Sequence, residues 1–326
     1  MRIILASDEN YFPYIYVSVL TLFESNQKEN YLVTFIYQNV GADKLQYLKA
    51  LGSNYGRIVE TIEFVMPKEY DKLPPYAESK TTYAKFLFAS MFPKDDRVLY
   101  LDPDTIVMDS LKDLFLCEMA GFLIAGVTEC LPQYHKNASK MGKKDQYING
   151  GMVLCNLELW RETSFEEKAL ERLLDTRYNL NYDQGILNEL CSGRIKVLQP
   201  KYNVLAEVFE FKSAEKLKKR YRFERYYTQA EIDTALEHPA IIHFTGFLYG
   251  KPLSVNCTHP YAGFFWKSVK KCPWDVKLND NTLDKKRQIR RWVLHHMPFK
   301  IYLVLEELFD IRRRWYLQRE DKFNSL

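Results

Sequence analysis

Two aspartates one residue apart, Asp102 and Asp104, follow the apolar run 98–101 in this 326-residue chain. If that run is a buried strand, side chains two positions apart point to the same side, so both carboxylates face one point. Hard divalent cations such as Mg²⁺ and Mn²⁺ take oxygen ligands, commonly one or two protein carboxylates completed by water and substrate phosphates. The pair therefore predicts a metal and diphosphate site, while the alternative is a turn in which Asp, Pro and Asp simply end the strand.

Other polar groups stand where further strands should end or turns should fall. They are Asp8, Asn10 and Tyr11 after the run 3–6, Asn149-Gly150-Gly151 before the run 152–157, Asp183-Gln184 before a helix over 185–190, and His243 after Ile241-Ile242. Each has a purely structural explanation, namely a turn, a core histidine or a helix N-cap. It is their joint order along the chain that points to a site.

The elements that must position these residues follow the order of an α/β domain. Apolar runs and helical spacing predict strands over 3–6, 31–37, 57–65, 98–102 and 152–157, and helices over 13–23, 43–51 and 79–91. Strands that alternate with helices imply a mostly parallel sheet. Ligands of such open sheets bind beyond the carboxyl ends of the strands, where Asp8 and Asp102 lie.

Several classes of site and location are excluded by what the sequence lacks. The chain contains no GxGxxG, GxxxxGK(S/T), GxSxG or HExxH motif, which excludes a dinucleotide fingerprint, a P-loop, a hydrolase elbow and a zinc-protease helix. Its six cysteines show no CxxC pair and are expected to be reduced thiols. No run approaches the roughly 18 apolar residues of a spanning helix, and the N-terminal apolar run is too short for a signal peptide. A cytoplasmic location is therefore expected.

Basic charge is concentrated near the C-terminus. Between residues 285 and 319 the chain has ten Lys or Arg and three acidic residues, an excess of +7, although its net charge is only +4. Helical spacing divided at Pro298 predicts two helices there. A basic amphipathic segment over 283–320 fits an anionic membrane surface, where each cation adds about 1 kcal/mol, and it equally fits a helix packed on the body. Nucleic acid is disfavoured, because the body is acidic and no nucleic-acid motif accompanies the tail.

Six segments, taken in chain order, resemble the motifs of family 8 retaining glycosyltransferases. They are ASDENY at 6–11, TYAK at 82–85, RVLYLDPD at 97–104, YINGG at 147–151 with Asn156-Leu157, NYDQ at 181–184 and HFTG at 243–246. The resemblance covers residues 1 to about 255 and is specific as a combination. It implies an α/β GT-A fold over 1–260 with a C-terminal basic helical region over 261–326. It also implies a donor that is usually a UDP-sugar and a transfer that retains the anomeric configuration with Mn²⁺, or with Mg²⁺.

The resemblance also implies a role for each matching position. Asp102, Asp104 and His243 would bind the metal, and Asp183 and Gln184 would act at the sugar, with Gln184 nearest the anomeric carbon. The other donor-binding positions would be Ala6, Asp8, Asn10, Tyr11, Lys85, Pro103, Asn149, Gly150, Gly151, Gly246 and Lys251. Because a protonated imidazole releases a metal, activity is expected to fall below about pH 6.

Two positions depart from the family pattern. Lys85 stands where many members carry arginine, so the charge is kept but the planar guanidinium fork is lost. Lys251 follows Gly246 later than usual, and the tryptophan that normally follows is absent. The Gln184 amide is a poor nucleophile, which favours a front-face reaction in which the diphosphate accepts the acceptor's proton. A double displacement stays open.

The sequence thus predicts transfer of galactose or glucose from UDP to a glycan or glycolipid, in the synthesis of lipopolysaccharide or a similar cell-surface glycan at the inner face of the plasma membrane. A nucleotidyltransferase would begin with a Gly-rich basic loop, which residues 6–11 lack. A non-catalytic glycan- or membrane-binding protein with a degenerate site is the other alternative. Such a protein would not need the three metal-binding residues together with Asp183 and Gln184. The loops 68–80 and 130–145 are expected to hold the acceptor, which no side chain identifies.

Overall fold

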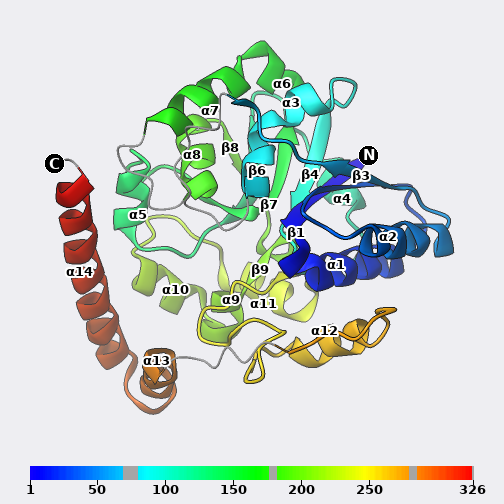
Figure 1. Ribbon diagram of the computed structural model, residues 1–326. Helices are drawn as coiled ribbons and strands as arrows, with labels where there is room; N and C mark the ends of the chain where they lie inside the picture. Colours follow the sequence, from blue (N-terminus) through cyan, green and yellow to red (C-terminus); the bar gives the residue numbers. More distant parts are fainter. Residues whose placement is uncertain (69–79, 176–181, 279–284, 325–326) are drawn as a thin grey trace.

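The computed structural model describes residues 1–68, 80–175, 182–278 and 285–324 (Figure 1). Parts of three predicted segments lie outside these ranges, namely most of the loop 68–80, Asn181 of the NYDQ motif, and residues 283–284 of the basic tail. The remaining predicted segments can be compared with the structure.

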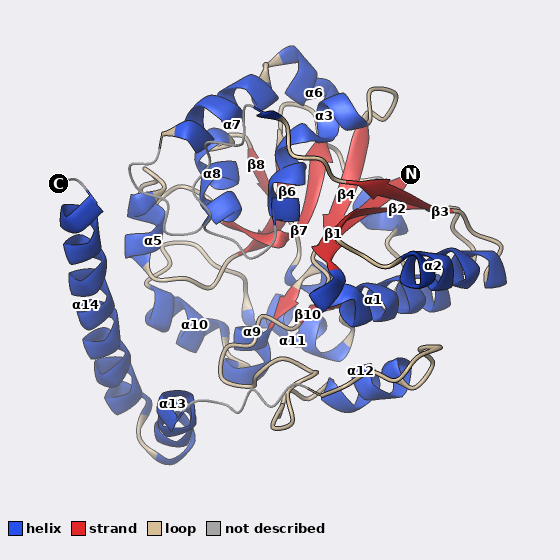
Figure 2. Ribbon diagram, viewed as in Figure 1, coloured by secondary structure: helices blue, strands red, loops and turns tan. Residues whose placement is uncertain are grey.

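A seven-stranded sheet forms the centre of the molecule, with helices on both faces (Figures 1 and 2). Its strands, in spatial order, are β3 (Val59–Glu63), β2 (Leu32–Gln38), β1 (Arg2–Asp8), β4 (Arg97–Leu101), β7 (Ile148–Asn156), β6 (Ile124–Thr128) and β8 (Ile195–Val197). Neighbouring strands are parallel, except that β7 runs antiparallel to β4 and β6. The predicted mostly parallel α/β sheet is confirmed.

Alternate side chains of the strands build two separate cores, as the two-residue repeat of a strand requires. Ile3 and Leu5 pack in the core under α1 (Phe12–Ser25) and α2 (Ala42–Asn54), whereas Ile4 and Ala6 pack in the opposite core. Helices of that opposite face are α3 (Phe88–Met91), α6 (Leu157–Glu162), α7 (Phe165–Leu174) and α8 (Tyr182–Leu190). Two short helices, α4 (Lys112–Phe115) and α5 (Gln133–Ala138), lie in the connections around β6.

A smaller sheet continues from the central one and carries a third core. It consists of β5 (Thr105–Val107), β10 (Ile241–His243) and β9 (Val204–Leu205), in the order β5-β10-β9. Around it lie η4 (Pro200–Tyr202), α9 (Ala206–Phe211), α10 (Ala214–Tyr221), α11 (Gln229–Glu237) and α12 (Ala262–Val269). Because β5 follows β4 after only three residues, the end of the central sheet lies directly against the small sheet.

Four local predictions need correction. The helix expected over 79–91 is a 3-10 helix, η3 (Lys80–Leu87), followed by the single turn α3. Four consecutive side chains, 83–86, are buried there, which the one-sided stripe of an amphipathic α-helix does not provide. The strand expected to begin at 152 begins at Ile148, so Asn149-Gly150-Gly151 lies inside β7 and is not a turn before it. The strand expected over 98–102 ends at Leu101. The helix expected over 185–190 begins at Tyr182, so Asp183-Gln184 lies in its first turn and not before it.

The two helices predicted in the basic tail are confirmed as α13 (Lys285–His296) and α14 (Phe299–Asn324), divided at Pro298. Tyr302 and Glu306 of α14 are buried against the body, and α14 runs along the outer side of the molecule (Figure 1). None of the helices in the described ranges is both long and apolar enough to cross a membrane.

Candidate functional site

The two aspartates and the histidine singled out in the sequence converge at the junction of the two sheets. His243 Nε2 lies 3.3 Å from Asp104 Oδ1 and 3.7 Å from Asp102 Oδ2. One potential ligand atom from each residue lies within 4.8 Å of the others. The convergence does not come from the period of one strand, since Asp102 follows β4 and Asp104 precedes β5. A turn at Pro103 joins them, and His243 pairs with Thr105 across β10 and β5.

Neighbouring charges keep Asp104 ready for a cation. Burial alone would raise the pKa of Asp104, but the ion pair with Lys251 and the contact with His243 outweigh it and hold that pKa well below its usual range. Burial likewise disfavours the imidazolium of His243, yet Asp104 and Asp102 together raise the pKa of His243. Asp104 is therefore ionised at neutral pH, as a metal ligand must be.

The surroundings of the three residues fit a divalent ion. A Cβ atom on Gly151 would lie 2.2 Å from His243 Cε1 and 2.5 Å from Asp102 Oδ2, so only glycine lets the imidazole sit this close to the strand. His243 Nδ1 is buried and has no hydrogen-bond partner among the described residues. Two carboxylates and one imidazole directed at a single point suit Mn²⁺ or Mg²⁺.

Lys85 extends from η3 into the same edge of the sheet. Its Nζ donates to Asp183 Oδ2 at 2.5 Å and to the carbonyl of Gly150 at 3.2 Å, and it lies 3.8 Å from Asp102 Oδ1. Burial opposes its charge, but Asp183 and Asp102 raise the pKa of Lys85. The lysine is thus a buried positive charge between two groups of residues. We call Asp102, Asp104 and His243 the metal side, and Asp183 and Gln184 the predicted sugar side.

Gln184 is held by the strand beside it. The N–H of Gly150 donates to Gln184 Oε1 at 2.8 Å, and a Cβ on Gly150 would lie 3.2 to 3.4 Å from the Gln184 side chain. Asn149 is fixed in turn, because its Nδ2 donates to Glu129 Oε2 at 2.5 Å and its Oδ1 accepts from Asn203 at 2.9 Å. The antiparallel direction of β7 brings its first residues to the end of β4, where the N–H of Asp102 donates to the carbonyl of Gly151.

Two carboxyl groups of this region, the half-buried Glu129 and the buried Glu207, were not predicted. Burial, opposed by the hydrogen bond from Asn149, raises the pKa of Glu129. Burial, followed by the repulsion of Glu129, raises the pKa of Glu207 on α9 to about 8. Glu129 follows the apolar run of β6, so it had the same strand-end signal as Asp8. Glu207 gives no such signal, because it stands within the apolar segment 204–209.

The predicted nucleotide-binding residues lie at the end of β1, the neighbour of β4. Asp8 caps η1 (Glu9–Tyr11) by accepting from the N–H of Asn10 at 3.0 Å. The Tyr11 ring is 41% exposed, and Lys251 Nζ lies 5.7 Å from its centre. Ala6 is buried in the core beneath. The end of β1 is therefore connected to the metal side through Tyr11 and Lys251.

The long spacing between Gly246 and Lys251 is absorbed by a turn. Gly246 has φ +86°, a conformation that side chains disfavour, and its carbonyl accepts from the N–H groups of Tyr249 and Gly250. This closed turn returns the chain so that Lys251 reaches Asp104. The departure in spacing therefore leaves the lysine at the metal side.

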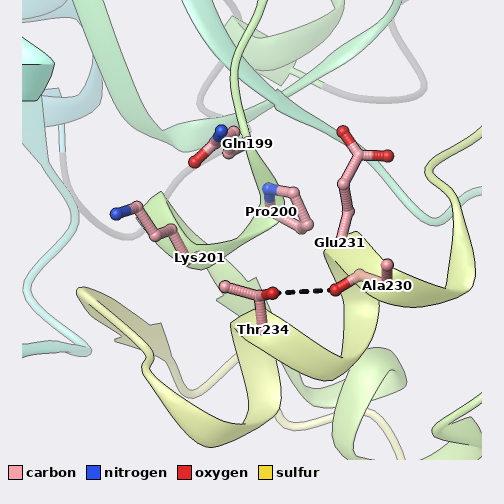
Figure 3. A pocket seen from close by; sticks show the side chains of 6 residues that line it. All are labelled: Gln199, Pro200, Lys201, Ala230, Glu231 and Thr234. Atoms are coloured by element: carbon pink, nitrogen blue, oxygen red, sulfur yellow. Dashed lines mark hydrogen bonds between the residues drawn. The ribbon is translucent and has the colours of Figure 1, made fainter.

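A separate surface pocket of about 160 Å³ lies between η4 and α11 (Figure 3). Two of its polar groups are already used locally, since Thr234 donates to the carbonyl of Ala230 at 2.8 Å and Glu231 closes the N-terminal capping box of α11. It holds no cluster of groups comparable to the site at the sheet edge.

A sequence profile described as glycosyl transferase family 8 matches residues 2–252. A putative glycosyltransferase of Haemophilus influenzae is 26% identical over 62% of this chain and 63% of that protein, which is less than two thirds of its length. A lipopolysaccharide 1,2-glucosyltransferase of Escherichia coli K12 is 26% identical over 89% of this chain and 84% of that one.

A crystal structure of the galactosyltransferase LgtC in complex with donor and acceptor sugar analogues superposes with a TM-score of 0.70. The superposition covers 85% of this chain and 98% of that chain, at 22% identity. At this level of identity the likeness concerns the fold, and it agrees with the GT-A architecture expected from the sequence.

Proposed function

The chain belongs to glycosyl transferase family 8, and from this premise we propose that it transfers a hexose, galactose or glucose, from a UDP-sugar to a glycan or glycolipid with retention of the anomeric configuration. The observation that carries the proposal is the convergence of Asp102, Asp104 and His243 beside the Lys85–Asp183 pair. The names of the relatives support a hexose donor and a cell-surface glycan such as lipopolysaccharide.

In this proposal Asp102, Asp104 and His243 hold Mn²⁺ or Mg²⁺, which when bound offsets the charge of the leaving diphosphate. Lys251 adds a second positive charge beside Asp104, and the exposed face of Tyr11 next to it is available for the uracil base. Because the aspartates raise the pKa of His243, protons compete with the metal at a higher pH than an ordinary histidine would allow.

A front-face reaction agrees best with the charges around the sugar side. Gln184 is an amide whose oxygen is held by the Gly150 N–H, and the nearby carboxylate of Asp183 is paired with Lys85. Neither is a free nucleophile of the kind that a double displacement needs. The bond from the anomeric carbon to the diphosphate breaks, the acceptor oxygen bonds to that carbon on the same face, and the acceptor's proton passes to the departing diphosphate.

The experiment that tests the transferase is calorimetric titration of UDP with and without Mn²⁺, followed by an assay of hydrolysis over a panel of UDP-sugars. Metal-dependent UDP binding with slow hydrolysis of one sugar supports the proposal and identifies the donor. Absence of UDP binding under both conditions contradicts it.

We further propose that the tail binds an anionic membrane surface at the inner face of the plasma membrane. One side of α14 packs on the body, whereas Ile289, Trp292, Ile301, Val304, Leu308, Ile311 and Trp315 of the helix pair are 44% to 62% exposed. Such an apolar strip beside the cluster Arg312-Arg313-Arg314 combines the two interactions of interfacial helices. The sequence left two alternatives for the tail, a helix packed on the body and a helix on a membrane surface. One face of α14 is buried against the body, and a different, exposed face is available for the membrane.

Cosedimentation with vesicles containing anionic lipid tests the membrane proposal. Replacement of Ile301, Val304 and Leu308 by serine should lower binding at least tenfold. The matched control replaces Ile58, Val65 and Leu116, exposed apolar residues of the body, by serine and should bind as the unmodified protein does. Equal binding by both variants rules out the tail as the anchor.

A further inference from the structure

A second cavity, of about 260 Å³, lies between the loop after α5 and the segment after α10. Its size is near the lower end of the range of small-molecule sites. The charged groups that line it are Lys136, Lys143, Lys144 and Arg225 together with Asp145 and Glu224. Four cations therefore face two carboxylates, and three of the cations and Asp145 belong to the loop 130–145 expected to hold the acceptor.

Three of the four cations of this cavity, Lys143, Lys144 and Arg225, are exposed and make no ion pair with any described residue. Lys136 is buried, and its Nζ donates to the backbone carbonyl of Asp145 at 2.9 Å. Burial lowers the pKa of Lys136 against the attraction of Asp145 and Glu224. The two carboxylates therefore do not compensate the positive charge.

The cavity lies at the same edge of the central sheet as the metal side. Thr128, the last residue of β6, and Tyr147, just before β7, both line it. The N–H of Glu129 donates to the carbonyl of Tyr147, and Glu129 binds Asn149. Three residues of extended chain from Tyr147 to Gly150 span about 10 Å. One acceptor molecule can therefore reach both places.

We propose that this cavity binds an anionic group, phosphate or carboxylate, of the acceptor glycan. The inference rests on the proposed transferase function and names the class of its acceptor. The donor diphosphate has its own positive partners at Lys251 and the metal side, so a second cluster of cations implies a second anion. Phosphate and carboxylate share the charge and the acceptor oxygens that lysine and arginine recognise.

Calorimetric titrations of the full chain, saturated with UDP and Mn²⁺ so that the donor side is filled, test the proposal. The probes are glucose 6-phosphate, glucuronate and neutral glucose. We expect at least one anionic sugar to bind ten times more tightly than glucose, and more weakly as salt is added. Tighter binding of glucose 6-phosphate than of glucuronate identifies a phosphate site, and the reverse identifies a carboxylate site. Equal affinity for these two anionic sugars, with both tighter than glucose, identifies a site for either group.

The variant Lys143→Ala/Lys144→Ala/Arg225→Ala should lose this preference at least tenfold while hydrolysing UDP-sugar as before. A control with the same loss of charge, Lys267→Ala/Lys270→Ala/Lys277→Ala, changes exposed lysines of α12 and the segment after it, none of which lines the cavity, and should keep the preference. Equal binding of glucose and the anionic sugars, or an unchanged triple variant, overturns the inference. If UDP itself does not bind, the transferase proposal fails, and the same titration without UDP still decides whether the cavity binds anions.

Discussion

Two clusters of buried charge in this protein differ in what completes them. At the contact between α14 and the body, both oxygens of Glu306 are paired, one with Arg290 at 2.5 Å and the other with Arg220 at 2.7 Å. At the metal side, no hydrogen bond from a described residue reaches Asp102 Oδ2, and His243 Nδ1 has no partner either. In the first cluster the Glu306 carboxylate is fully paired, although Arg220 Nε has no hydrogen-bond partner among the described residues. In the second cluster the unpaired atoms belong to potential metal ligands that converge on one point.

The two clusters are connected by one short helix, α9. Glu207 faces the predicted sugar side, where Thr245 donates to it at 3.4 Å. Glu210, one turn later, is 1% exposed and lies 2.5 Å from His295 of α13. Unpaired buried atoms occur in both clusters, since Arg220 Nε and Glu210 Oε2 also lack a hydrogen-bond partner among the described residues. The candidate site differs in that one potential ligand atom from each of its three residues lies within 4.8 Å of the others.

The largest effect is expected from Asp104→Asn. Asparagine has the same shape but lacks the charge that the metal needs, so hydrolysis of the UDP-sugar should fall roughly a thousandfold or more. Circular dichroism should show a folded protein, since the change removes no packing atom. Unchanged activity would mean that Asp104 is not a metal ligand. The candidate site would then no longer differ from the Glu306 cluster in the way described above.

The second prediction breaks the other cluster. Glu306→Gln leaves Arg220 and Arg290 without the carboxylate they share, and loss of one partner of a buried ion pair costs about 3 kcal/mol. Chemical denaturation should show this loss, while hydrolysis per folded molecule at low temperature stays the same. A large fall in activity at full stability would contradict the purely structural role of Glu306.

The third prediction compares neighbouring glycines of β7. Gly151→Ala places a methyl group against His243 and Asp102, so Mn²⁺ affinity should fall about a hundredfold. Gly150→Ala is the matched control, because its methyl group meets Gln184 at 3.2 Å and needs only a small shift. Titration of Mn²⁺ measures both variants. Equal losses would mean that the strand and not the metal position is disturbed.

The smallest effect concerns the pH dependence of stability. The pKa of Glu207 rises from 4.5 to about 8 on folding, so its protonated form is favoured in the folded state. Its contribution is complete below about pH 4.5 and is lost as the pH rises through 8. Glu207→Gln mimics the protonated form, so its melting temperature should exceed that of the unmodified protein at pH 8.5 and approach it near pH 5. A difference that is constant with pH would contradict the shift.

Local signals in the sequence predicted the alternation of strands and helices from β1 to β4 and the division of the tail at Pro298, because periodicity reports which residues are buried. The strands β5, β6, β8 and β9 were not predicted. A strand end pointed to Asp102, whereas the set Asp102, Asp104 and His243 came from the family motifs. The metal role of that set and the roles of Asp183, Gln184 and Lys251 are still predictions.

The packing of the helices and sheets determines which side chains meet. The closeness of Gly151 to His243, the pairing of Lys85 with Asp183 and the burial of Glu207 each join residues far apart in the chain. Such distances depend on how the sheets pack, which no local pattern encodes. For the same reason the tail could be predicted as amphipathic, yet only packing showed that Glu306 is buried while Val304 and Leu308 remain exposed.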